Sequence, residues 1–106
     1  RRFGSSRMAS PPSSPACLVS VRFLPSARLE GAGWKLGDIQ RIESNEAMAA
    51  VPLAVAKELG LPEDIINVEG GAIARGPPIG ATGAVLTTLL VHSMRRDGIK
   101  CGVVTL

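Results

Sequence analysis

The fold of this chain depends on residues 70–83, which read Gly-Gly-Ala-Ile-Ala-Arg-Gly-Pro-Pro-Ile-Gly-Ala-Thr-Gly. Five of these fourteen residues are glycine and two are proline, a composition that neither a regular helix nor a regular strand tolerates. An apolar, strand-like run at residues 65–68 precedes the stretch, and a long helical pattern at residues 84–96 follows it. The sequence therefore predicts a strand, a tight irregular loop and a helix. In such a loop, backbone N–H groups and a helix N-terminus face whatever occupies it.

The segments on either side of this loop predict an α/β layered domain, because helical and strand-like patterns alternate along the chain. The expected helices cover residues 26–32, 46–59 and 84–96, and the expected strands cover residues 17–24, 39–43, 65–68 and 102–106. Between the first helix and the strand at 39–43, Trp34 and Leu36 are expected to pack under a turn at residues 37–38.

The central helix has recognisable end signals. Asn45 is expected to be its N-cap, and Glu46 lies in the first turn, where a negative charge is favourable. Pro52 is expected to kink the helix or to delay its regular part. Gly60 followed by Pro62 predicts a clear stop. For Asn45 a purely structural cap is the simplest interpretation of the residue alone.

Composition limits the domain organisation and the class of partner. The 106 residues suffice for one small domain, and the apolar content of 45% is typical of a globular protein. Residues 1–24 are expected to form a poorly patterned, basic, Ser/Pro-rich segment, either a disordered arm or junction sequence, separate from a domain at residues 25–106. Residues 1–29 carry a charge of +5 and residues 30–106 a charge of −2, so a nucleic-acid surface is not expected on the domain. An organelle transit peptide is the alternative for the arm, but its three closely spaced prolines argue against one, and the cytoplasm is favoured over the mitochondrion.

Several kinds of site are not expected. Two cysteines, Cys17 and Cys101, and one histidine, His92, make neither a disulfide framework nor a metal site. No apolar run approaches the roughly twenty residues of a membrane span. Nucleotide binding is the rival interpretation of the loop, but its glycines fit neither the P-loop nor the dinucleotide-binding spacing.

Two motifs carry a family resemblance. Residues 45–49 read Asn-Glu-Ala-Met-Ala, and together with residues 70–83 they resemble the C-terminal half of thiolases, the acetyl-CoA acetyltransferase and 3-ketoacyl-CoA thiolase family. That family carries Asn-Glu-Ala-Phe-Ala and Gly-Gly-Ala-Ile-Ala-x-Gly-His-Pro-x-Gly-Ala-Ser/Thr-Gly. The resemblance runs from about residue 25 to residue 106. It implies a partial C-terminal domain of the thiolase-like layered αβαβα fold.

The resemblance also implies site residues. The asparagine that matches Asn45 holds a water that completes an oxyanion hole, and Met48, Gly76 and Gly80 match positions near the substrate. The catalytic histidine of the family falls on Pro77, which has neither a proton to transfer nor a side-chain donor. The two reactive cysteines of the family have no counterpart here: one belongs to an N-terminal half, and the other opens a Cys-x-Gly-Gly-Gly run expected just after Leu106.

The implied function is acyl transfer in fatty acid metabolism: thiolysis of a 3-ketoacyl-CoA, or condensation of two acyl-CoA units. The resemblance implies a coenzyme A thioester as substrate, no separate cofactor, and a homodimer or homotetramer in the complete enzyme. Because Pro77 replaces the histidine and both cysteines are missing, the chain alone is expected to be inactive. The alternative is a non-catalytic thiolase-like protein that serves binding or assembly.

Overall fold

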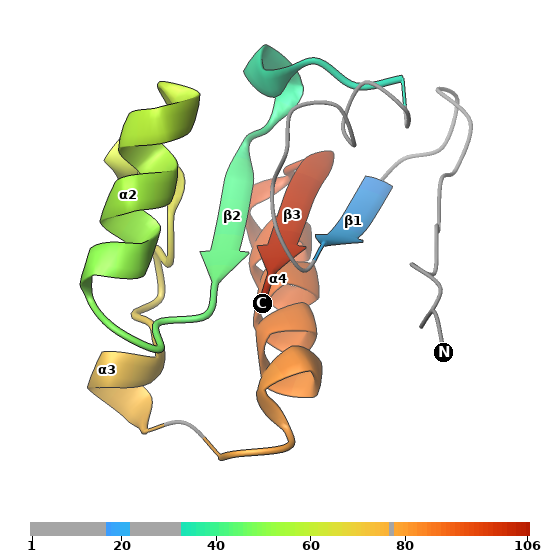
Figure 1. The fold of residues 1–106 in the computed structure, drawn as a ribbon. Helices are drawn as coiled ribbons and strands as arrows, with labels where there is room; N and C mark the ends of the chain where they lie inside the picture. The colour runs from blue at the N-terminus through green and yellow to red at the C-terminus, as the bar shows by residue number, and fades with distance from the viewer. Residues whose placement is uncertain (1–16, 22–32, 77) are drawn as a thin grey trace, which may run out of the picture.

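The computed structural model describes residues 17–21, 33–76 and 78–106. Three parallel strands form one sheet in the order β1-β3-β2, with β1 at Cys17–Val21, β2 at Arg41–Ser44 and β3 at Cys101–Thr105 (Figure 1). The strands expected near residues 17–24, 39–43 and 102–106 are thereby confirmed. The helix expected at residues 26–32 lies outside the described residues.

β1 belongs to the segment 1–24 that the sequence separates from the domain. Its five residues pair in parallel with β3, from Cys17 beside Cys101 to Val21 beside Thr105. β3 is therefore the central strand of the sheet. The strand expected at residues 102–106 therefore has a neighbour on each side, and β1 and β2 form the edges of the described sheet.

The chain between β2 and β3 contains every α-helix of the described part: α2 (Ala50–Leu59), α3 (Ala72–Arg75) and α4 (Thr82–Asp97). Two short 3-10 turns, η1 (Leu36–Asp38) and η2 (Glu63–Ile65), complete the order. α4 packs along one face of the sheet, and α2 lies beyond β2 (Figure 1). No helix in this part of the chain combines the length and apolar character needed to cross a membrane.

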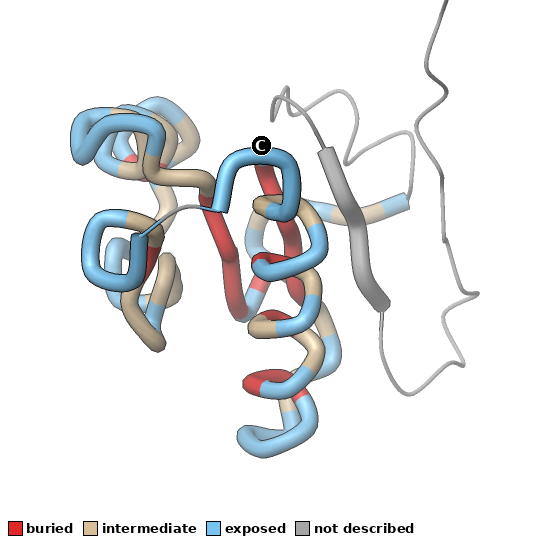
Figure 2. The backbone as a smooth tube through the Cα atoms, turned by 90° about the horizontal axis from the view of Figure 1, so that it is seen from below, coloured by how far each residue is buried: buried red, intermediate tan, exposed pale blue. Residues whose placement is uncertain are grey.

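Two apolar clusters hold the sheet in place. On the α4 side, Leu86, Leu90 and Met94 recur at intervals of four residues and pack on Val104. On the other face, Ile42 and Val103 pack with Ile39, and half-buried side chains that include Trp34 and Leu36 surround them. The burial of β2, β3 and the inner face of α4 is visible in Figure 2. The packing expected for Trp34 and Leu36 is confirmed.

The strand expected at residues 65–68 is wrong. Residues 63–65 form η2, and only Ile66 makes a single bridge, to Ile42 of β2. Asn67 then adopts a left-handed backbone with φ 48°, which ends any extended run. The apolar residues Ile65 and Ile66 are used for packing against the Ile42 cluster instead of for strand pairing.

Candidate functional site

The candidate site lies at the carboxyl edge of the sheet, where parallel strands end together. Asn45 directly follows β2, and its backbone N–H donates to the carbonyl of Thr105, the last residue of β3, at 2.9 Å. The first turn of α4 reaches the same edge, because a Cβ at Gly83 would lie 3.6 Å from Leu106. The two motifs of the sequence thus meet where ligands bind in many open α/β sheets.

The N-cap role expected for Asn45 is wrong. α2 begins at Ala50 with Ala49 as its cap residue, and Asn45 remains four residues upstream. Pro52 explains the delay, since it occupies the third helical position, where a missing N–H costs no intrahelical hydrogen bond. Gly60, in contrast, ends the helix in the left-handed conformation as expected. Asn45 is consequently not needed as a helix cap.

Glu46 also differs from its expected place in the first turn of the central helix. Its carboxylate turns toward the glycine-rich loop, where Oε1 accepts from Asn67 Nδ2 at 2.7 Å and Oε2 accepts from the Ile73 N–H at 3.0 Å. Asn67 in turn bonds to both backbone groups of Ser44. Sequence analysis missed Asn67. Its signal is an asparagine three residues before a glycine pair, because asparagine tolerates the left-handed conformation better than most residues.

The loop itself contains more regular structure than expected. The four residues of α3 follow the first two glycines, and α4 begins at Thr82, two residues earlier than the sequence predicts. Gly76 and Gly80 adopt φ values of +81° and +94°, although a Cβ at either position would meet nothing within 4 Å. Backbone conformation, and not crowding, therefore favours glycine at these two positions.

Two residues near the site are exposed: Met48, which the sequence predicts near the substrate, and Ile79 of the loop. Met48 is 67% exposed and Ile79 of the loop is 98% exposed, so both side chains face outward from the described residues. Position 77 lies outside the described residues. Between α3 and α4, beneath the loop, a hollow of about 30 Å³ is lined by Gly76, Pro78 and Thr82 among others. That space holds about one water-sized group, so this hollow by itself is too small for an acyl chain.

A set of charged residues connects the beginning of β2, the last turn of α4 and Glu69. Arg41 of β2 donates to Asp97 of α4 at 2.7 Å. Arg96 forms ion pairs with Asp97 and with Glu69, which precedes the glycine-rich loop. The hydrogen bonds from Arg96 and Arg41 lower the pKa of Asp97, and the bond from Arg96 lowers the pKa of Glu69. These contacts fix the last turn of α4 on β2 and on the loop entrance.

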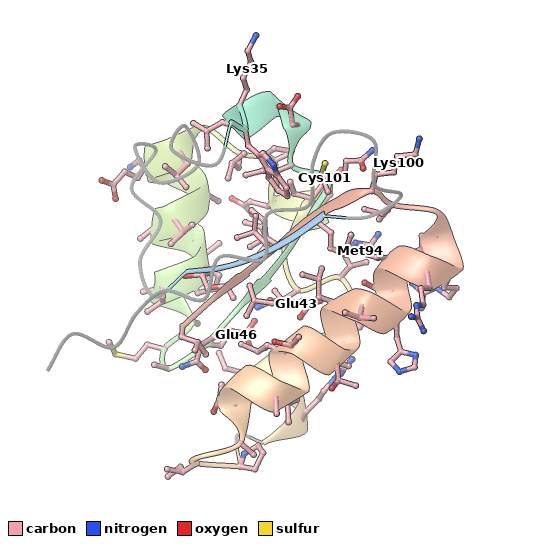
Figure 3. The ribbon with its side chains drawn as sticks, turned by 90° about the vertical axis from the view of Figure 1, so that its right-hand side faces the viewer. Lys35, Glu43, Glu46, Met94, Lys100 and Cys101 are labelled. Carbon is pink, nitrogen blue, oxygen red and sulfur yellow. The ribbon has the colours of Figure 1, made fainter. Side chains whose placement is uncertain are left out.

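Glu43 is the unusual member of this region. Its side chain is fully buried on the α4 side of β2, and neither carboxylate oxygen has a hydrogen-bond partner among the described residues (Figure 3). Burial raises its pKa to about 7, although the positive charges of Arg75 and Arg41 oppose the rise. Near neutral pH both the protonated and the ionised form of this buried carboxyl group are therefore populated.

Comparison with known proteins agrees with this geometry. A family model described as the C-terminal domain of thiolase matches residues 8–106. The chain belongs to the thiolase family. The match begins within the segment 1–24 and includes β1. Membership confirms the fold predicted from the two motifs, a partial C-terminal domain of the layered α/β thiolase fold.

Individual thiolases resemble the chain over most of its length. It is 51% identical over 85 residues to an acetyl-CoA acetyltransferase of Shinella zoogloeoides, a match that covers 78% of this chain and 22% of that protein. It is 48% identical over 86 residues to a 3-ketoacyl-CoA thiolase of Bacillus subtilis. This match covers 81% of this chain and 22% of that protein. The crystal structure of the Bacillus anthracis acetyl-CoA acetyltransferase superimposes with a TM-score of 0.68 at 45% identity, over 72% of this chain and 19% of the other. The chain therefore spans about a fifth of the length of these thiolases.

Proposed function

We propose that this chain is the C-terminal portion of an acyltransferase of the thiolase type, which cleaves 3-ketoacyl-CoA with coenzyme A or condenses two acyl-CoA units. The observation that carries the proposal is the hydrogen bond between Asn45 and the end of β3, since it holds the Asn-Glu-Ala motif beside the start of α4. Relatives named acetyl-CoA acetyltransferase and 3-ketoacyl-CoA thiolase support the same reaction class.

In this proposal Asn45 binds a water that donates a hydrogen bond to the developing oxyanion of the thioester. Its half-buried position and its tie to Thr105 suit a preorganised group, because such donors act through fixed placement. Met48, Gly76 and Gly80 border the acyl-CoA substrate. The thioester itself supplies the reactive carbonyl, so the reaction as proposed takes no separate cofactor, and the complete enzyme is proposed to be a dimer or tetramer.

The residues of this chain leave the reaction incomplete. In the proposed complete enzyme one cysteine accepts the acyl group as a thioester, while a histidine and a second cysteine move protons. At position 77 a proline stands where the resemblance places that histidine, and proline cannot transfer a proton. We therefore expect no turnover by the 106 residues alone, because the members of such a site act as a unit.

A chimeric enzyme tests this function. Residues 33–106 replace the matching segment of the Shinella zoogloeoides acetyl-CoA acetyltransferase, and thiolysis of acetoacetyl-CoA is followed by the loss of its enolate absorbance. We expect the chimera with Pro77 to be about 10²-fold to 10⁴-fold slower than the Pro77→His chimera, the range that a general acid or base contributes. Pro77→Ala is the matched control, since it removes the proline ring without adding an imidazole.

Two results would contradict the proposal. A folded Pro77→His chimera with no thiolysis would show that this segment does not support acyl transfer. Equal rates for the Pro77 and Pro77→His chimeras would show that position 77 takes no part in the reaction.

A non-catalytic thiolase-like role is the second candidate, and the observation that favours it is Pro77 within an otherwise intact loop motif. Under this alternative the Pro77 chimera binds acetyl-CoA without turning it over. The Pro77→His chimera distinguishes the two candidates: restored thiolysis is expected from the acyltransferase, whereas acetyl-CoA binding in a calorimetric titration without thiolysis is expected from the binding role.

A further inference from the structure

The two sequence motifs of the site are joined by a small set of hydrogen bonds that neither motif contains by itself. Asn67 Oδ1 accepts from the Ser44 N–H at 2.7 Å, and Asn67 Nδ2 donates to the Ser44 carbonyl at 3.1 Å and to Glu46 Oε1 at 2.7 Å. The side chain thus uses its acceptor and its amide group on the residues that flank Asn45 on both sides. Its left-handed backbone, with φ 48°, directs it there.

Glu46 continues the connection to the loop. Its Oε2 accepts from the Ile73 N–H in the first turn of α3, and a Cβ on Gly71 would overlap the carboxylate. Gly71 is buried, so the carboxylate approaches the loop backbone as closely as the absence of a side chain allows. Glu46 lies near the carboxyl ends of the strands in Figure 3, apart from the buried Glu43. We define these contacts as the Glu46–Asn67 clamp.

We propose that Asn67 and Glu46 are positioning residues, which set the location of Asn45 relative to the loop that carries position 77. The inference rests on the proposed acyltransferase function. Asn45 is held by its backbone at Thr105 and flanked by Ser44 and Glu46, both of which the clamp binds. The other end of the clamp holds α3, which ends at Arg75, and Gly76 then leads directly to position 77. Neither Asn67 nor Glu46 is assigned contact with the substrate.

In the clamp Asn67 is the hydrogen-bond donor and Glu46 the acceptor, and two substitutions exchange these roles. Asn67→Asp keeps the size of the side chain but replaces the donor to Glu46 with a carboxylate, so two acceptors face each other. Adding Glu46→Gln restores one donor and one acceptor in exchanged order at the contact between residues 46 and 67, and the glutamine oxygen still accepts from Ile73, whereas the bond to the Ser44 carbonyl stays lost. Glu58→Gln, on the exposed side of α2, is the control for loss of a negative charge alone.

The first measurement is amide hydrogen exchange on the folded chimera that carries residues 33–106. We expect Asn67→Asp to raise the exchange rate of the Ile73 N–H about tenfold or more while the α4 amides keep their protection, since the opening is local. The double variant is expected to recover protection. Unchanged exchange at Ile73 in Asn67→Asp overturns the clamp, and loss of protection throughout α4 overturns the claim that its role is local.

The second measurement is steady-state thiolysis in the Pro77→His chimera. We expect Asn67→Asp to lower kcat about a hundredfold, the order found for small misplacements of reacting groups, with KM changed less than about threefold. The Glu46→Gln/Asn67→Asp pair is expected to regain most of the lost kcat, and Glu58→Gln to change nothing. A kcat that Asn67→Asp leaves intact overturns the inference. An inactive Pro77→His chimera that retains Asn67 instead refutes the proposed function, and the exchange experiment then decides the clamp by itself.

Discussion

At the scale of single residues, Glu43 is the group whose environment differs most from that expected of a strand residue facing outward. α4 covers it, its oxygens have no hydrogen-bond partner in the described part, and its pKa rises from 4.5 to about 7. Four charged groups influence it: Arg75 and Arg41 favour the ionised form, whereas Glu69 and Glu46 oppose it. Burial outweighs the two arginines because a carboxylate without a partner loses most of its hydration.

The raised pKa predicts that stability falls as pH rises. Below about pH 4.5 the carboxyl is protonated in both the folded and the unfolded state, so it contributes no pH dependence. As pH rises from 4.5 to about 7 only the unfolded state loses the proton freely, and we expect the free energy of unfolding to fall by up to about 3 kcal/mol. Glu43→Gln removes this slope in urea titrations between pH 4.5 and 8, whereas Glu58→Gln keeps it.

A wild-type slope retained by Glu43→Gln would assign the effect to another group. Asp97 does not interfere with this test, because its contribution to the free energy of unfolding changes with pH in the opposite direction. Its pKa is lowered from 3.8 by hydrogen bonds from Arg96 and Arg41, so its contribution is complete above that value and is lost only as pH falls below it.

At the scale of elements, α4 determines the architecture of the site. Its apolar stripe covers Gly102 and Val104 of the central strand, and its first turn lies beside the end of that strand. Gly102 is required for this close approach, since a Cβ there would lie 2.6 Å from the Met94 sulfur and 2.9 Å from Leu90. Leu86, Leu90 and Met94 are buried, as their four-residue spacing on a helix indicates, whereas Val85 is 36% exposed.

Shortening one buried side chain at the centre of α4 tests this packing. Leu90 is fully buried, so Leu90→Ala is expected to lower the free energy of unfolding by about 2–5 kcal/mol through lost burial and a residual cavity. Thr88→Ala, on the exposed side of the same helix, is expected to change it by less than about 0.5 kcal/mol. Chemical denaturation followed by circular dichroism measures both, and equal effects would refute the assigned helix orientation.

At the scale of the whole molecule, the described residues leave apolar surface uncovered. Leu53 and Ile73 are 53% and 63% exposed beside a cavity of about 290 Å³, and Ile79 is almost fully exposed. β2 is an edge strand of the described sheet, and its outer side carries no further strand, only the bridge to Ile66 and the hydrogen bonds to Asn67. Such surface and such an edge promote association. Under the proposed function, the remaining part of the acyltransferase covers this surface.

We therefore expect the chain expressed alone to aggregate or to remain partly unfolded. Light scattering after size-exclusion chromatography should give an apparent mass that rises with concentration. Leu53→Lys combined with Ile79→Lys is expected to lower that mass without lowering the melting temperature, because both side chains already face solvent. A soluble wild-type monomer with a sharp, cooperative thermal transition would contradict this expectation.

The sequence by itself determined the elements with strong local signals and the family. Apolar spacing with glycine caps defined α4 and the end of α2, and two long motifs identified the thiolase C-terminal domain. These features depend on neighbouring residues, so local chemistry suffices to predict them. Pro52 also delayed α2, one of the two outcomes that its ring predicted, although Asn45 was wrongly taken as the cap.

Only the tertiary structure decided what depends on residues far apart in the chain. In the folded chain Asn67 bonds to Ser44 and Glu46, the two neighbours of Asn45, and Glu43 is buried beneath α4. Residues 65 and 66 pack against the core and do not form a strand. The fold also puts β3, and not β2, at the centre of the sheet. The physical reason is common to all four: hydrogen-bond partners, hydration and strand neighbours come from segments more than twenty residues away, and no local pattern encodes them.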